Sequence, residues 1–98
     1  MNMVVGICTI ELNIPGVSSL KEKRSHLKSL KARLHREFNV SVAEIALHDV
    51  WQSSTIGVGV VSTAVNHAEN VLENVVRWIE RHRPDLDVID YGVVVEHW

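Results

Sequence analysis

A single amphipathic, basic stretch from Ser18 to Phe38 constrains the fold of this chain more than any other part of the sequence. Its apolar residues recur at spacings of 7, 3, 4 and 4 residues. At about 100° per residue they fall within an arc of about 80°, which is one face of a helix. The pattern therefore predicts one long helix over residues 18–38. The residues of its apolar face are Leu20, Leu27, Leu30, Leu34 and Phe38.

The same helix carries a row of cations beside its apolar face. Residues 17–38 hold seven basic and two acidic side chains, a local charge of +5, whereas the rest of the chain holds three basic and ten acidic ones, a local charge of −7. One interpretation is a solvated helix face whose charges pair with acidic residues elsewhere in the chain. The other is a surface that meets an anion such as RNA. This basic stripe consists of Lys21, Arg24, Lys28 and Lys31, with His35 on the same arc and Arg33 and Arg36 flanking it.

Lys23 is a cation that falls inside the apolar arc of this helix, where a lysine is unexpected. The sequence favours a lysine whose aliphatic stem covers the core while its ammonium group reaches water near the start of the helix. The alternative is an ion pair with a carboxylate of the sheet, Glu11 or Glu44, or an anion site.

The remaining sequence alternates between strand and helix patterns. Apolar residues at helical spacing predict a second helix from Ala64 to Arg81. Alternating apolar and polar residues predict strands, and a shift of this alternation near Ala43–Glu44 indicates a β-bulge. The predicted strands cover residues 3–14, 40–47, 54–62 and 86–96.

The order strand, helix, strand, strand, helix, strand predicts a ferredoxin-like α+β fold, a βαββαβ chain whose four-stranded antiparallel sheet carries both helices on one face. The chain of 98 residues is long enough for one domain, residues 1–98. The first and third strands are then central, and the opposite face of the sheet is open. That open face is expected to carry Thr9, Glu11, Gly57, Gly59 and Val61.

This open sheet face indicates an alternative function, a homo-oligomeric protein-interaction or small-ligand-binding module. Small, partly apolar faces of this kind are commonly covered by a second copy of the chain. We expect Gly57, Gly59 and Val61 at such an interface. Trp78 is assigned either to a contact surface or to the margin of the core. Trp51 is expected to cap the core below the hairpin connection between the second and third predicted strands.

Three segments of the sequence together resemble the small bacterial YlxP-like family, whose members are of unknown function. The segments are Ser19–Arg24, Phe38–Glu44 and Asp49–Val58. The resemblance spans nearly the whole chain and implies a ferredoxin-like domain without assigned catalytic residues. The genes of this family often lie beside those for translation initiation and ribosome maturation factors, which implies RNA or the ribosome as a partner.

The sequence contains no signature of a catalytic or metal site. It has no Gly-x-Ser-x-Gly, phosphate loop or His-Glu-x-x-His motif, and its six histidines lack the close spacing typical of zinc ligands. The single Cys8, in an apolar alternating strand, fits an inert core residue and a reducing compartment. Without a run of about 18 apolar residues or a basic signal-peptide start, we expect a cytoplasmic protein with no membrane span, no cofactor and no enzymatic activity.

The predicted central strands carry no aromatic residue on the open face, so the base-stacking mode of RNA recognition motifs is excluded. An RNA partner would instead place its phosphates on the basic stripe, which gives weak, salt-sensitive and largely sequence-independent binding. The sequence therefore predicts a non-enzymatic homodimer that associates with RNA or a ribosomal particle through its first helix.

Overall fold

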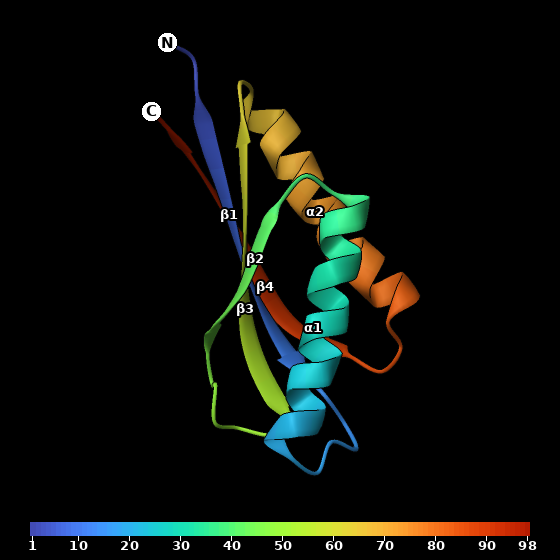
Figure 1. Ribbon diagram of the computed structural model, residues 1–98. Helices are drawn as coiled ribbons and strands as arrows, with labels where there is room; N and C mark the ends of the chain where they lie inside the picture. The colour runs from blue at the N-terminus through green and yellow to red at the C-terminus, as the bar shows by residue number, and fades with distance from the viewer.

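Two helices lie side by side on one face of a four-stranded sheet in the computed structural model, which describes all residues from 1 to 98 (Figure 1). The elements are β1 (Val4–Asn13), α1 (Leu20–Glu37), β2 (Ser41–Ala46), β3 (Ser53–Ser62), α2 (Val65–His82) and β4 (Asp87–His97). The strand order is β2-β3-β1-β4, and each neighbouring pair is antiparallel. The predicted ferredoxin-like fold is therefore confirmed, with β1 and β3 in the centre of the sheet.

The alternation of the central strands decides where the core lies. The even-numbered residues of β1 and β3 face the helices, and they pack against the apolar face of α2, which includes Leu72. A Cβ atom at Gly6 would come within 2.9 Å of Leu72 Cδ1, so the glycine allows α2 to lie close to β1. Cys8 is fully buried in this core, and burial raises the pKa of its thiol to about 11, as expected for an inert core residue.

A buried ion pair connects α1 to β2. Lys23 is only 1% exposed, and its Nζ lies 2.8 Å from Oε2 of Glu44 and donates a hydrogen bond of 2.6 Å to the carbonyl oxygen of Leu47. The hydroxyl of Ser54 donates to the same Glu44 oxygen at 2.6 Å. The expectation that the ammonium group reaches water is therefore wrong, and the alternative, an ion pair with Glu44, is correct.

Opposing effects act on the charge of Glu44. Partial burial disfavours the ionised carboxylate, but the hydrogen bonds from Lys23 and Ser54 and the positive charge of Lys23 outweigh it. The pKa of Glu44 is therefore held below its ordinary value of 4.5, and the group is ionised at neutral pH.

The irregularity of β2 lies later than the sequence predicted. The sequence predicted a bulge near Ala43–Glu44, whereas the irregularity in the ladder with β3 falls between Glu44 and Ala46. Glu44 faces inward on the same side of β2 as the buried Val42, and its carboxylate binds Lys23 there. The displaced residue is therefore Ile45, one position later than expected.

The loop between β2 and β3 leaves large apolar side chains in solvent. It begins at Leu47, whose φ of 64° is uncommon for a residue other than glycine. Val50 and Trp51 are exposed, Trp51 by 50%. The expectation that Trp51 caps the core is therefore wrong, because half of this residue is exposed to solvent.

We expect Lys23→Met to lower the free energy of unfolding by about 3 kcal/mol, because removing one partner of a buried ion pair leaves the other partly desolvated and unpaired. Urea unfolding at neutral pH measures this loss. Lys21→Met, on the exposed side of the same turn, is the matched control and should change stability by less than about 0.5 kcal/mol.

The ion pair also predicts a pH dependence. Since the pKa of folded Glu44 lies below its ordinary value, its contribution to stability is present above pH 4.5 and is lost as the pH falls through the folded pKa. Wild type should therefore lose more stability between neutral pH and about pH 3.5 than Lys23→Met does. Equal losses in the two proteins would contradict the stabilisation of Glu44 by Lys23.

Candidate functional site

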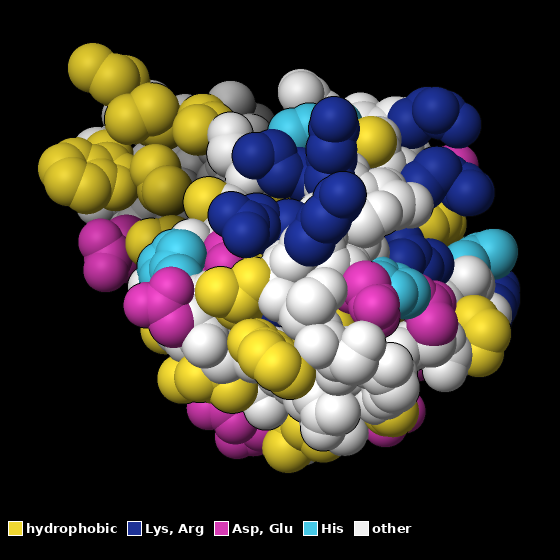
Figure 2. Space-filling model, turned by 60° about the horizontal axis from the view of Figure 1, so that its bottom comes forward, with side chains coloured by type: hydrophobic (Ala, Val, Ile, Leu, Met, Phe, Trp, Pro, Cys, Tyr) yellow, Lys and Arg dark blue, Asp and Glu magenta, His cyan; other side chains and the backbone are white.

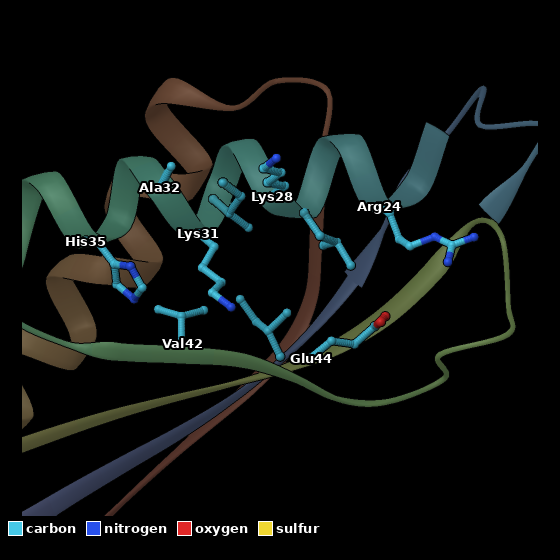
Figure 3. Close-up of a pocket in the computed structure, with 10 residues that line it drawn as sticks. Arg24, Lys28, Lys31, Ala32, His35, Val42 and Glu44 are labelled. Carbon is cyan, nitrogen blue, oxygen red and sulfur yellow. The ribbon is translucent and has the colours of Figure 1, made fainter. Parts of the chain in front are cut away.

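A groove of about 360 Å³ runs between α1 and β2 (Figure 3). Lys31 and His35 extend from α1 toward Val42 of β2, while Arg24 and the carboxylate of Glu44 lie at the other end of the groove. Cations line its rim, and apolar side chains form its wall. The apolar wall consists of Leu27, Leu30, Val42 and Ile56, and the rim consists of the cations Arg24, Lys28 and Lys31 together with His35.

The cations of the basic stripe are exposed and free of ion pairs. None of the four ion pairs in the structure includes Lys21, Arg24, Lys28 or Lys31. Figure 2 shows Lys and Arg side chains gathered together on the surface of the molecule. None of these four cations therefore pairs with an acidic residue elsewhere in the chain, whereas a solvated helix face agrees with their exposure.

Arg33 and Arg36 do not belong to this groove. The guanidinium of Arg33 lies 5.3 Å from the centre of the Trp78 ring, on the side of α1 that faces α2, and its Nη2 is 3.9 Å from Oε1 of Glu37. Arg36 is exposed but does not line the groove. Of the six cations singled out in the sequence, three line the groove and Lys21 continues the same row toward the start of α1.

The open face of the sheet carries the small residues that the sequence predicted. Gly57, Gly59 and Val61 all lie at positions of β3 on the face of the sheet away from the helices, and Val61 is 66% exposed. Trp78 lies instead on α2, half-buried against the core, with its ring stacked on His82 at 4.9 Å. The proposed interface set is therefore divided between two sides of the molecule.

Sequence reasoning missed two apolar residues of the open face, Ile7 and Ile45. Ile7 of β1 and Ile45 of β2 are exposed on this face, Ile7 beside Val94 of β4 and Ile45 beside Gly57 of β3. Ile45 was missed because the sequence predicted a shift of alternation before it, whereas the alternation of β2 continues through Ile45. Ile7 had a usable signal, since it has the same strand parity as Thr9 and Glu11.

Sequence reasoning also missed the groove as a unit. A helical wheel identifies the cations of α1, but it contains no information on Val42 and Glu44, which belong to another element. Three or more His, Cys, Asp or Glu side chains gather nowhere in a way that could hold a metal ion. Neither helix is long and apolar enough to cross a membrane.

Comparisons with known proteins agree with this architecture. Residues 5–93 match the family model "Protein of unknown function (DUF503)". The "Uncharacterized protein YlxP" of Bacillus subtilis (strain 168) is 36% identical over 77 residues, which are 79% of this chain and 84% of that protein. Among solved structures, "De novo designed protein Foldit4" has a TM-score of 0.52 over 96% of both chains at 18% identity, a likeness of fold alone.

The strand order and the helix placement define a ferredoxin-like domain with an exposed basic helix. Within that class, the chain belongs to the DUF503 family of unknown function, which confirms the resemblance to YlxP-like proteins.

Because the stripe consists of unpaired like charges at i,i+3 and i,i+4 spacing, it should reduce the stability of α1. We expect Lys28→Gln to raise the free energy of unfolding by about 0.5 kcal/mol at low salt, by removing the repulsion from Arg24 and Lys31. The gain should disappear in about 1 M salt, where charges are screened. A loss of stability on this substitution would show that Lys28 makes a favourable interaction in the folded protein.

Proposed function

We propose that this protein is a non-enzymatic RNA-binding protein that contacts phosphates through the basic stripe of α1. The observation that carries the proposal is the row of four exposed cations, Lys21, Arg24, Lys28 and Lys31, none of which is paired with a carboxylate. The row extends about 15 Å along the helix, at a rise of about 1.5 Å per residue. A cationic surface of this length suits contact with several phosphates of one RNA segment.

The gene setting of the family supports the same partner. Genes of YlxP-like proteins often lie beside those for translation initiation and ribosome maturation factors, so a cytoplasmic ribosomal particle or its RNA is the partner we propose. Phosphate contacts alone carry no sequence information, and the binding is therefore expected to be weak and strongly salt-dependent.

A salt series of binding to ribosomal RNA tests this proposal. Four phosphate contacts predict a slope of log affinity against log salt of about −3 to −4. Reversing Lys28 and Lys31 to Glu should abolish detectable binding while leaving the circular dichroism spectrum unchanged, because both side chains are exposed.

The matched control is the reversal of Arg77 and Arg81 to Glu, which changes the net charge equally on exposed positions of α2. This control should keep most of the affinity. Equal loss in the two double variants would mean that overall charge, and not the stripe, governs binding. Absence of binding by wild type even at low salt would refute the proposed function.

A second candidate function is self-association through the open face of the sheet. It is favoured by the exposure of four aliphatic side chains on that face, each at least 45% exposed: Ile7, Ile45, Val61 and Val94. Contiguous apolar surface of this kind often marks an interface between proteins. We propose a homodimer as the form that covers it.

Gly59→Trp tests this dimer. A Cβ atom at Gly59 would meet no protein atom closer than 3.9 Å, so the monomer has room for the new side chain, which would project from the open face. We expect sedimentation to shift from dimer toward monomer while the affinity for RNA stays unchanged. A wild-type protein that sediments as a monomer at high concentration would exclude the dimer.

A further inference from the structure

The groove between α1 and β2 has an apolar wall that phosphate binding alone does not require. Leu27, Leu30 and Val42 line this groove together with the cations of its rim. Its volume of about 360 Å³ lies in the lower part of the range of small-molecule pockets, about 300–1,000 Å³. A ligand that fits both the apolar wall and the rim of cations has a flat or apolar body and carries negative charge on the side toward solvent.

Glu44 adds a hydrogen-bond acceptor at one end of the groove. Its Oε2 accepts the hydrogen bond from Ser54 and forms the ion pair with Lys23, whereas no protein group donates a hydrogen bond to its Oε1. An ionised carboxylate oxygen can only accept hydrogen bonds. A fatty acid or another hydrocarbon ligand would place no donor opposite Oε1 and would desolvate the carboxylate without compensation, which costs free energy.

We infer that this groove binds one unpaired nucleotide of RNA, with the base against the apolar wall, an amino group of the base donating to Oε1 of Glu44, and the flanking phosphates on Lys28 and Lys31. The inference rests on the proposed function, which it deepens: the stripe holds the RNA backbone, and the groove distinguishes an unpaired nucleotide from a duplex. Guanine, adenine and cytosine carry an amino group. Uracil presents carbonyl oxygens on both sides of its N–H group, and these would face the carboxylate unfavourably.

The test uses RNA hairpins of one sequence, each with a single bulged nucleotide, and a fully paired hairpin with the same number of phosphates. We expect a bulged guanosine, adenosine or cytidine to bind wild type about tenfold more tightly than the paired hairpin, the low end of what one good base contact contributes. A bulged uridine should gain less. A bulged 2-aminopurine, which has an amino group, should change its fluorescence on binding, and this readout requires no protein variant.

Leu27→Trp fills the groove from a half-buried position and should remove the preference for bulged RNA while the salt slope stays at its wild-type value. Leu27→Met, which nearly conserves the volume, is the matched control and should keep the preference.

The outcomes separate the two proposals. Equal affinity of wild type for bulged and paired hairpins, with no fluorescence change of the bulged 2-aminopurine, overturns the nucleotide site and leaves the basic stripe as an RNA contact. Failure of wild type to bind any of the hairpins at low salt overturns the proposed function as well.

Discussion

The buried ion pair between Lys23 and Glu44 is the interaction on which the arrangement around α1 depends. It joins the first turns of α1 to the edge strand β2, and through Ser54 and the carbonyl of Leu47 it also reaches β3 and the loop between the strands. Buried ion pairs add little net free energy, because the cost of desolvation offsets the attraction. The effect of this pair is therefore on geometry: it holds Glu44 against α1, directly before the irregularity at Ile45.

This geometry creates the candidate site. With Glu44 held inward, β2 lies beneath one side of α1, and the groove opens between the two elements. The charge of Lys23 is paired with Glu44 within the fold, whereas Arg24, the next residue, and Lys28, five residues after Lys23 along the helix, are exposed to solvent. Helix α1 thus carries one cation that is paired within the fold and others that face solvent. Only the paired one, Lys23, is bound to a carboxylate of the facing strand.

Charge is distributed unequally over the two sides of the molecule. The side of α1 that borders β2 is basic, while the open face of the sheet bears Glu11, Asp90 and Glu96 among exposed aliphatic residues. An anionic partner is attracted to the first side and repelled from the second. RNA binding and self-association would therefore use different surfaces, and neither excludes the other.

The sequence by itself determined the element order, the inward parity of β1 and β3 and the row of cations, because the periods of 2 and 3.6 residues are local properties of the chain. It placed Lys23 in the apolar arc but assigned its ammonium group to water, and it expected Trp51 in the core. The first error arises because Lys23 and Glu44 are 21 residues apart, and only the tertiary structure decides which groups meet across a helix and a strand. The second arises because the sequence does not show that Trp51 lies half exposed in the loop between β2 and β3. The groove is likewise a feature of the tertiary structure, because its cations come from α1 and its hydrogen-bond acceptor, Glu44, comes from β2. Burial and charge pairing in it depend on both elements together.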